Sequence, residues 1–368
     1  MKAVGVGVIG TGFGQIVHIP GLREHPHTEV VAVYHRDIAK ANQVAEKFQI
    51  PYTCDRLEDL FSIPKVEAVT ISTPPFLHYI AAKAAIASGK HILLEKPTTL
   101  SVAEAIALYH LAAKHKVVAA MDFEFRFVPE WRYFKHLLDR NFVGKKRLIT
   151  IDWIVQGRAD PRRAWNWYSQ KTCGGGALGS LGSHTFDYVN WLFGSVKHLC
   201  GQLSTAIPER PHSDGTMRPV DADDTCNILL ELEDGTPCNI CISTVSYQGS
   251  GHWVTVYGDR ATLVLGSGNK SDYVHGFQVQ QAEVGKVEME VMPIPSEYQL
   301  PQTYPDGRLA PFIAICDRFV NAIRTESPML PSLREGVYSQ LLMDLTHQSH
   351  QQRKWLDVPS LESILQKS

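Results

Sequence analysis

The sequence has no uncharged apolar run of the roughly 18–20 residues that a membrane-spanning helix needs. Its apolar start, up to Ile9, is short, runs at once into a glycine loop and has no small-residue cleavage site after it. We therefore interpret this start as a buried strand rather than as a signal peptide. We expect no membrane partner.

The sequence also has no excess of charge of one sign, because 36 basic residues face 38 acidic ones and the formal net charge is −2. A basic field over the whole molecule, as found in proteins that bind nucleic acid, is therefore absent. We expect no nucleic-acid partner.

The seven cysteines are few, odd in number and scattered, which argues for a reducing compartment rather than a disulfide framework. Cys238 and Cys241 form a CxxC in a strand-like run, where positions i and i+3 face opposite sides, so we interpret them as two ordinary thiols. No metal-binding triad stands out among the sixteen histidines. We expect a cytoplasmic protein without a bound metal.

The 368 residues, 44% of them hydrophobic and 20% charged, match a folded globular protein of about two domains. Over residues 1–122, short β-branched apolar runs alternate with helical stretches. This alternation predicts a doubly wound parallel sheet of the Rossmann type. The expected strands are Val4–Ile9, Glu29–Tyr34, Ala68–Ser72, His91–Leu94 and Val117–Met121, and the expected helices are Ile38–Phe48, His78–Ser88 and Val102–His115.

Residues 123–368 read as a second domain of the α+β class. Strand-like runs separated by turns predict a mainly antiparallel open sheet with helices on one face. The expected strands are Lys146–Val155, Asn227–Leu232, Asn239–Ser243, Trp253–Tyr257, Thr262–Leu265 and Phe277–Gln281. The expected helices are Pro129–Arg140, Ser183–Phe193, 312–324 and 334–350, and a proline-rich loop is expected over 290–311.

A glycine loop, Gly10-Thr11-Gly12-Phe13-Gly14, follows the first expected strand and opens a helix. In a dinucleotide-binding turn the first glycine permits the tight bend, and the second lets the backbone approach a pyrophosphate at the helix N-terminus. The third position of the GxGxxG pattern holds Gln15, with Gly14 one residue early. The surrounding strand–helix units favour a cofactor site over a tight turn without a ligand.

The second expected strand ends at Tyr34-His35-Arg36-Asp37. A carboxylate at this tip binds the ribose 2′-hydroxyl of NAD, whereas a nearby arginine suits the 2′-phosphate of NADP. We interpret His35 as the tip, Arg36 as the phosphate ligand and Asp37 as the N-cap of the next helix. The sequence therefore favours NADP over NAD, unless Arg36 is only a solvated loop charge.

Two further segments follow expected strands, Ser72-Thr73-Pro74-Pro75 and Glu95-Lys96-Pro97. Ligands of doubly wound sheets bind outside the carboxyl ends of the strands, so both segments are expected at the cofactor edge. A desolvated lysine is a usable acid–base group, although Lys-Pro alone would more often be a surface feature. The predicted cofactor-binding residues are Gly10, Thr11, Gly12, Phe13, Gly14, His35, Arg36, Ser72, Thr73, Pro74, His78, Glu95, Lys96 and Pro97. His18 is interpreted as a structural histidine.

These segments together resemble the Gfo/Idh/MocA oxidoreductase family, the group of glucose–fructose oxidoreductase and inositol dehydrogenase. The second half agrees with the resemblance, which covers nearly the whole chain. The matching segments there are Arg126-Phe127-Val128-Pro129, the run Gly174–Leu178 leading to Gly182-Ser183-His184 and Asp187, and the tail Pro331–Gly336.

The resemblance implies that Lys96 is the catalytic lysine beside the nicotinamide, that the Lys96–Pro97 peptide is cis, and that His184 is the acid–base partner facing the substrate. It implies hydride transfer between NADP or NAD and a carbinol carbon of a sugar, polyol or related small molecule. It also implies a homodimer or homotetramer, for which the alternating run Trp253–Tyr257 offers an open sheet face, although core packing explains that run equally well.

The chain departs from the family pattern at Ser180, where many members carry an aspartate one helical turn before the histidine. Serine carries no charge at neutral pH, so the full lysine–aspartate–histidine set is in doubt. Asp187 is interpreted as a structural helix residue rather than a replacement. The aromatic and basic loop Arg158–Tyr168, before the glycine run, fits either a sugar site or an interface. The predicted substrate-binding residues are Arg126, Trp165, Trp167, Lys171 and Ser180.

The residues therefore leave three functions open. The first is an NAD(P)-dependent dehydrogenase or reductase that acts on CH–OH groups. The second is a catalytically silent, nucleotide-sensing regulatory protein of the same fold, which Ser180 favours. The third is an NAD-dependent glycoside hydrolase.

Overall fold

The computed structural model describes residues 2–269 and 272–366, which form two compact units. One unit contains the chain up to Glu124 together with Gln302–Gln340, and the other contains Phe125–Pro301 and the chain from Leu341. No helix in the described residues is both long and apolar enough to span a bilayer.

The first unit is built on a parallel sheet, as predicted. Among the described residues, six strands pair in the order β3-β2-β1-β4-β5-β6, which is the Rossmann order. Every pairing in it is parallel, and β1, β4 and most of β5 are buried. The strands are β1 (Val4–Ile9), β2 (Thr28–Tyr34), β3 (Tyr52–Cys54), β4 (Ala68–Ile71), β5 (His91–Leu94) and β6 (Ala119–Met121).

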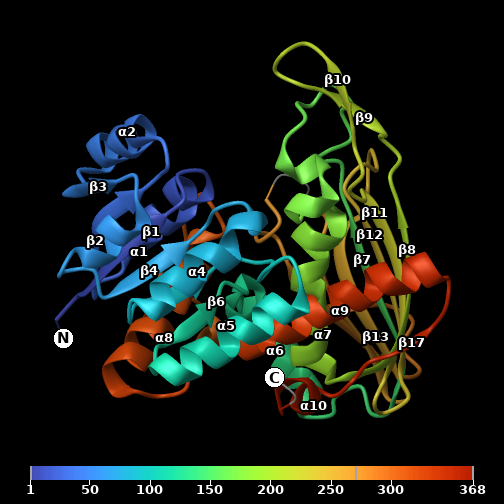
Figure 1. Cartoon of the computed structure of the whole chain (residues 1–368). Helices are drawn as coiled ribbons and strands as arrows, with labels where there is room; N and C mark the ends of the chain where they lie inside the picture. Colours follow the sequence, from blue (N-terminus) through green and yellow to red (C-terminus); the bar gives the residue numbers. More distant parts are fainter. Residues whose placement is uncertain (1, 270–271, 367–368) are drawn as a thin grey trace. The chain divides into compact units, whose positions relative to one another are not determined.

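Helices cover both faces of this sheet. The strand order runs one way from β1 to β3 and the other way from β4 to β6, so right-handed crossovers place the intervening helices on opposite faces. Figure 1 shows α4 and α5 running together beside the sheet, and their alanine-rich faces belong to its core. The helices of the first half are α1 (Ile19–Glu24), α2 (Ile38–Phe48), α3 (Leu57–Ser62), α4 (His78–Ala87) and α5 (Val102–His115).

A helix from late in the chain also belongs to the first unit. α8 (Leu309–Thr325) packs on α1, where Gly21 leaves room for Phe312: a Cβ at Gly21 would lie 2.4 Å from the Phe312 ring. At the other end of α8, Arg324 pairs with Glu67 at 2.9 Å. The sequence analysis placed all residues after 122 in one domain, whereas these contacts join Gln302–Gln340 to the first unit. No pattern within the α8 sequence predicts that this segment belongs to the first unit.

The second unit contains a mixed, mainly antiparallel sheet. Its strand order among the described residues is β16-β15-β14-β13-β7-β12-β11-β8-β17, and β7 and β12 pair in parallel. A separate hairpin consists of β9 (Glu209–Pro211) and β10 (Met217–Pro219). The sheet strands are β7 (Lys146–Ile154), β8 (Val196–Ser204), β11 (Thr225–Leu232), β12 (Pro237–Ser243), β13 (Gly251–Gly258), β14 (Ala261–Ser267), β15 (Gln278–Glu283), β16 (Glu290–Met292) and β17 (Leu356–Asp357).

An aromatic core joins this sheet to its helices. The Phe125 ring lies 4.9 Å from Trp131 and 5.5 Å from Trp153, and Trp153 stacks on His252 at 4.0 Å. Burial lowers the pKa of His252 to about 3, so this ring is a neutral member of the core. The helices of this unit are α6 (Pro129–Asp139), α7 (Ser183–Phe193), α10 (Leu361–Gln366) and, from Leu341 on, α9 (Leu333–Gln352).

The structure adds elements that the sequence analysis did not predict. β3, β9, β10, β16, β17, α3 and α10 have six residues or fewer, too short for a clear period. β8 is longer, but its inward and outward positions do not alternate cleanly. The region 290–311, expected to be a loop, contains β16 and the first turn of α8.

Candidate functional site

The glycine loop lies where the strand order of the first sheet reverses, between β1 and β4. Gly10 has φ +116°, and a Cβ there would lie 2.8 Å from the Ser72 backbone, so only glycine fits this turn. A Cβ at Gly12 would meet nothing within 4 Å. The backbone at Gly12 is therefore exposed and open to close approach by a ligand, as a pyrophosphate cradle requires.

Gly14 performs the packing role that the third glycine of the pattern usually has. A Cβ at Gly14 would lie 2.7 Å from Ser72 Oγ and 3.1 Å from Val8, so the first helix approaches the strands closely at this point. The early glycine therefore compensates for Gln15, whose amide donates to the Thr11 carbonyl at 2.6 Å. The loop fits a dinucleotide despite its imperfect pattern.

At the tip of β2, Asp37 is the N-cap of α2, as the sequence predicted. Asp37 caps α2 by accepting from the Ala39 N–H at 3.1 Å, and His35 Nδ1 accepts from the Asp37 N–H at 2.9 Å. Arg36 is exposed next to them. Asp37 is therefore engaged at the helix end, and the other side chains at this tip are His35 and Arg36.

His78 connects the two loops that follow β4 and β5. Its ring nitrogens lie 2.8 Å from the Thr73 carbonyl and 2.8 Å from the Pro97 carbonyl, and the ring is fully buried. Burial lowers the pKa of His78, which favours a neutral ring that donates through one nitrogen at a time. His78 thus holds the Ser72–Pro74 loop against the Lys96–Pro97 peptide, which is cis.

Glu95 and Lys96 lie directly after β5. Glu95 is buried, and Lys96 is half-buried at the carboxyl edge of the sheet. The Glu95 carboxylate accepts the Lys96 N–H through Oε2 at 3.2 Å and lies 3.1 Å from His18 Nε2 through Oε1. The side chain of Glu95 is therefore packed in the interior next to Lys96 and does not point to solvent.

His18 and Asp122 complete a buried cluster with Glu95. His18 Nε2 is 3.6 Å from Asp122 Oδ2. One ring nitrogen of His18 and one carboxylate oxygen each of Glu95 and Asp122 lie within 4.8 Å of one another. Sequence reasoning missed this partnership and classed His18 as structural. The available signal was that Asp122, like Glu95, directly follows a strand of the same parallel sheet.

In the second unit, His184 is the second residue of α7 and is buried. Its ring meets Phe125 edge-on, with centroids 5.1 Å apart. One turn earlier, Ser180 donates to the Gly176 carbonyl at 2.8 Å and lies 2.6 Å from the Tyr168 hydroxyl. Because the Ser180 hydrogen is directed to Gly176, Tyr168 donates to Ser180.

Arg158 extends this chain of contacts. Its guanidinium lies over the Tyr168 ring, 3.1 Å from the centroid. Burial lowers the pKa of Arg158 to about 10, and the cation nevertheless remains protonated at neutral pH. Arg158 and Tyr168 are the two ends of the aromatic and basic loop singled out from the sequence, although neither was among the predicted substrate-binding residues.

Arg126 is held by Asp187. The guanidinium donates to both carboxylate oxygens, at 2.8 and 2.6 Å, and the two side chains are 10% and 2% exposed. Arg126 also lies over the Trp191 ring at 5.7 Å. This paired geometry gives Asp187 a structural contact on α7 and leaves Arg126 little exposed surface.

The remaining predicted substrate residues lie in the loop before α7. Trp165 donates to the Pro219 carbonyl at 2.9 Å and so braces the β9–β10 hairpin. Trp167 is half-buried against Tyr168, and Lys171 is exposed. Of these three, Trp165 is tied to the fold by its indole, whereas Lys171 presents its side chain to solvent.

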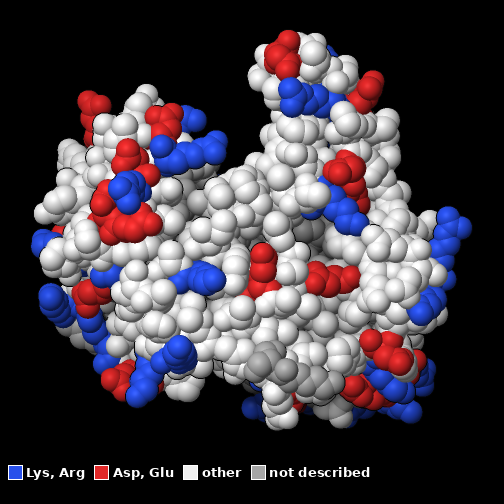
Figure 2. All heavy atoms as spheres, in the orientation of Figure 1, with Lys and Arg blue, Asp and Glu red and all other residues white. Residues whose placement is uncertain are grey.

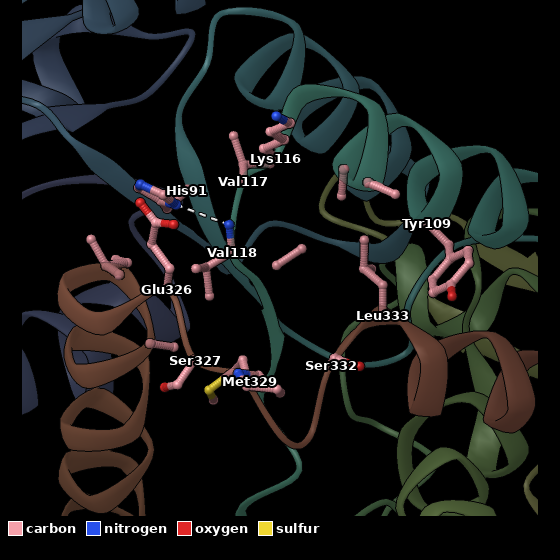
Figure 3. A pocket seen from close by; sticks show the side chains of 16 residues that line it. His91, Tyr109, Lys116, Val117, Val118, Glu326, Ser327, Met329, Ser332 and Leu333 are labelled. Atoms are coloured by element: carbon pink, nitrogen blue, oxygen red, sulfur yellow. Dashed lines mark hydrogen bonds between the residues drawn. The ribbon is translucent and has the colours of Figure 1, made fainter.

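A pocket of about 620 Å³ lies in the first unit, at the amino ends of β5 and β6 (Figure 3). His91 accepts from the Val118 N–H at 2.9 Å within it, and Tyr109, Glu326 and Met329 line its sides. The residues of the glycine loop and Lys96 lie at the opposite, carboxyl ends of the strands. This pocket is therefore separate from the predicted cofactor edge.

Surface charge is mixed. Figure 2 shows acidic and basic side chains interspersed over the face in view, including the tip of the β9–β10 hairpin. At that hairpin Arg218 pairs with Asp214 at 2.9 Å. The face in view has no continuous basic area, in keeping with the near-zero net charge.

Comparison with known proteins defines the class. Residues 4–123 match the oxidoreductase family with an NAD-binding Rossmann fold, and residues 135–358 match the C-terminal alpha/beta domain of the same family. The chain belongs to the Gfo/Idh/MocA family of oxidoreductases, as the sequence motifs indicated.

Individual relatives match along nearly the whole chain. An uncharacterized oxidoreductase of Synechocystis is 51% identical over 362 residues, covering 98% of this chain and 97% of the relative. Levoglucosan dehydrogenase of Pseudarthrobacter phenanthrenivorans is 25% identical over 403 residues, covering 99% of this chain and 100% of the relative. A solved structure of levoglucosan dehydrogenase with NADH and L-sorbose superposes with a TM-score of 0.86 at 24% identity, covering 98% of this chain and 100% of that one.

Proposed function

We propose that this protein is an NAD(P)-dependent dehydrogenase or reductase that transfers a hydride between nicotinamide and a carbinol or carbonyl carbon of a sugar, polyol or related small molecule. The observation that carries the proposal is the open backbone at Gly12, in the loop after β1 of a Rossmann sheet. Full-length similarity to levoglucosan dehydrogenase supports a sugar-like substrate.

The residues proposed to hold the dinucleotide are the glycine loop Gly10–Gly14, the β2 tip His35–Arg36, the loop Ser72–Pro74 with His78, and Glu95–Pro97. When bound, the nicotinamide supplies the hydride acceptor or donor, and the protein supplies orientation and electrostatics. Exposed Arg36 at the β2 tip favours NADP, because its guanidinium pairs with a phosphate bidentately. An Arg36→Ala variant that keeps its ratio of NADPH to NADH affinity would contradict this preference.

Lys96 is proposed as the acid–base group of the first unit. It is half-buried at the sheet edge, and its backbone is fixed by Glu95 on one side and by the His78-bound Pro97 on the other. A lysine in this setting can hold a substrate oxygen and give or take its proton. His184 is proposed as the acid–base residue of the second unit, and Arg126, Trp165, Trp167, Lys171 and Ser180 as the surrounding substrate contacts.

The test is turnover of a panel containing levoglucosan, glucose, xylose and myo-inositol, followed as nicotinamide absorbance. Lys96→Ala is expected to lower kcat by roughly 10²–10⁴-fold with the dissociation constant of the cofactor nearly unchanged. Equal turnover of the variant and the wild type would remove Lys96 from the mechanism.

A nucleotide-sensing, non-catalytic role is the second candidate, and the observation that favours it is Ser180, a neutral side chain bonded to Tyr168 and Gly176. Cofactor binding with no turnover of the whole panel would support that role. Release of an aglycone from glycosides without net change in nicotinamide absorbance would instead support a glycosidase.

We further propose a homo-oligomer formed through the open face of the second sheet, in a protein of the cytoplasm. On β13, Val254 and Val256 point into the core, whereas Trp253, Thr255 and Tyr257 face outward and are partly exposed. Leu229 on β11 is 45% exposed as well. A monomeric wild type in analytical ultracentrifugation would contradict this assembly, and Tyr257→Glu is expected to weaken it.

A further inference from the structure

A fully buried histidine lies beneath the Glu95–Lys96 corner. His18 is completely shielded from solvent, and its ring stacks on Phe312 of α8 at 4.5 Å and meets Phe13 edge-on at 5.7 Å. These two aromatic rings fix the plane of the imidazole. Its Nε2 faces the carboxylates of Glu95 and Asp122, at 3.1 and 3.6 Å.

The cluster retains protons at neutral pH. Burial alone would lower the pKa of His18, but the hydrogen bonds and charges of Asp122 and Glu95 outweigh it and raise the pKa to about 9. Burial and the charge of Glu95 raise the pKa of Asp122 to about 7. Burial opposes ionisation of Glu95 too, yet the hydrogen bond and charge of His18 lower its pKa.

The groups around the cluster reinforce this distribution. Lys96, from the end of β5, adds a positive charge that also lowers the pKa of Glu95. From α8, the buried Cys316 thiol faces Asp122, and burial raises its pKa well above the usual value, so it stays neutral. Arg308, at the start of α8, is paired with Asp306 and lies over Phe13 rather than in the cluster. Glu95 is consequently an ionised carboxylate, and the positive charge of His18 balances its negative charge.

Glu95 transmits this arrangement to Lys96. One carboxylate oxygen is bound to His18, and the other accepts the Lys96 N–H at 3.2 Å. With both oxygens engaged, the carboxylate has one orientation, and the backbone of Lys96 is fixed with it. Small displacements of a reacting group can cost roughly 10²-fold in rate, so a fixed lysine matters for turnover.

We propose that His18 is a positioning residue for Lys96: its imidazolium, together with Asp122, keeps the Glu95 carboxylate charged and in one orientation beneath the lysine. This inference deepens the proposed function and rests on the proposed role of Lys96.

The first arm of the test measures the cluster without any substrate. In the wild-type protein carrying ¹³C-labelled histidine, the His18 ring signal, assigned with His18→Gln, is expected to remain that of an imidazolium beyond pH 8. A His18 signal that titrates near pH 6.5 would overturn the proposal. This arm is independent of turnover, so it separates failure of the inference from failure of the proposed function.

The second arm compares His18→Gln with His25→Gln. His25 is a matched control, because it is also buried at the end of α1 and faces a carboxylate, Asp317 on α8, at 3.7 Å. On the panel sugar that the wild type turns over fastest, His18→Gln is expected to lower kcat roughly 10–100-fold while KM and the NADH dissociation constant change by about twofold or less. His25→Gln is expected to keep the wild-type kcat.

The pH profile supplies a readout that a merely structural role would not alter. As pH rises through about 9, His18 loses its proton, so the wild-type kcat is expected to fall over that range by more than the kcat of His18→Gln does. Identical alkaline limbs in the two proteins, or an equal loss of kcat in His25→Gln, would overturn the proposal. If the wild type turns over no panel compound, the proposed function fails while the histidine titration still decides the state of the cluster.

Discussion

The hydroxyl oxygens of Tyr168 and Ser180 lie 2.6 Å apart, at the position where many family members carry an aspartate. Ser180 donates a hydrogen bond to the Gly176 carbonyl. Tyr168 therefore donates to Ser180, and Ser180 in turn donates to the glycine run. A neutral hydrogen-bonded pair thus stands one helical turn before His184.

These two hydrogen bonds predict that substitutions at Tyr168 and Ser180 affect the free energy of unfolding in a coupled way. Ser180→Ala removes the acceptor of the Tyr168 hydroxyl and is expected to destabilise the protein by about 1–3 kcal/mol, whereas the double variant Tyr168→Phe/Ser180→Ala should cost less than the sum of the single changes. Denaturant unfolding of the four proteins measures the coupling. Strictly additive losses would mean that the two hydroxyls do not interact.

The glycine loop predicts opposite consequences for two neighbouring substitutions. Gly12→Ala places a methyl group in open space, so the fold is expected to keep its stability while NADH binding weakens. Gly10→Ala forces a side chain onto φ +116° and against Ser72, so thermal stability is expected to fall. Unchanged NADH affinity in a stable Gly12→Ala protein would show that no ligand approaches this backbone.

The buried ion pair of Arg126 and Asp187 predicts a large loss of stability when one partner is removed. Asp187→Asn leaves the Arg126 cation without its charged partner and is expected to cost about 3–5 kcal/mol in the free energy of unfolding. The exposed pair Arg162–Asp160, with side chains 88% and 49% exposed, is the control: Asp160→Asn should change stability little. Similar effects of the two variants would contradict the buried geometry.

The His18 cluster predicts how stability depends on pH. The folded protein binds the His18 proton more tightly than the unfolded chain does, so this stabilisation is complete below pH 6.5 and is lost as pH rises through about 9. Asp122 acts in the same direction: its contribution is complete below its usual pKa of 3.8 and is lost as pH rises through about 7. The unfolding temperature is therefore expected to fall from pH 7 to 9.

The control for this fall of the unfolding temperature with pH is a variant without the His18 imidazole. In His18→Gln the decline toward pH 9 should be shallower, measured by calorimetry at matched ionic strength. A decline as steep as that of the wild type would assign it to other groups.

Local sequence was sufficient for much of the first unit. The bounds of β1, α2, β5 and α5 match the predicted runs, because each run is apolar on the buried side and ends at a clear signal such as Gly10 or the cap Asp37. A hairpin turn at Gly235, with φ +80°, joins β11 to β12, two strands that the sequence predicted.

What the sequence could not provide are the contacts between distant segments. Phe312 fits over Gly21 only after α8 has returned to the first unit, and His18 meets Asp122 across the sheet, 104 positions along the chain. Neither pairing has a local pattern, since each partner alone reads as an ordinary apolar or structural residue. The Arg126–Asp187 pair has the same origin, since the sequence singled out the two residues separately and did not pair them.

The proposed function depends most directly on the binding of a pyridine nucleotide at the Gly12 backbone. Fluorescence titration of the wild-type protein with NADPH and with NADH tests it in one measurement, with Gly12→Ala as the matched control. We predict saturable binding of at least one of the two nucleotides, tighter for NADPH, and weakened in the variant. Absence of binding for both nucleotides to the folded wild type would contradict the central claim.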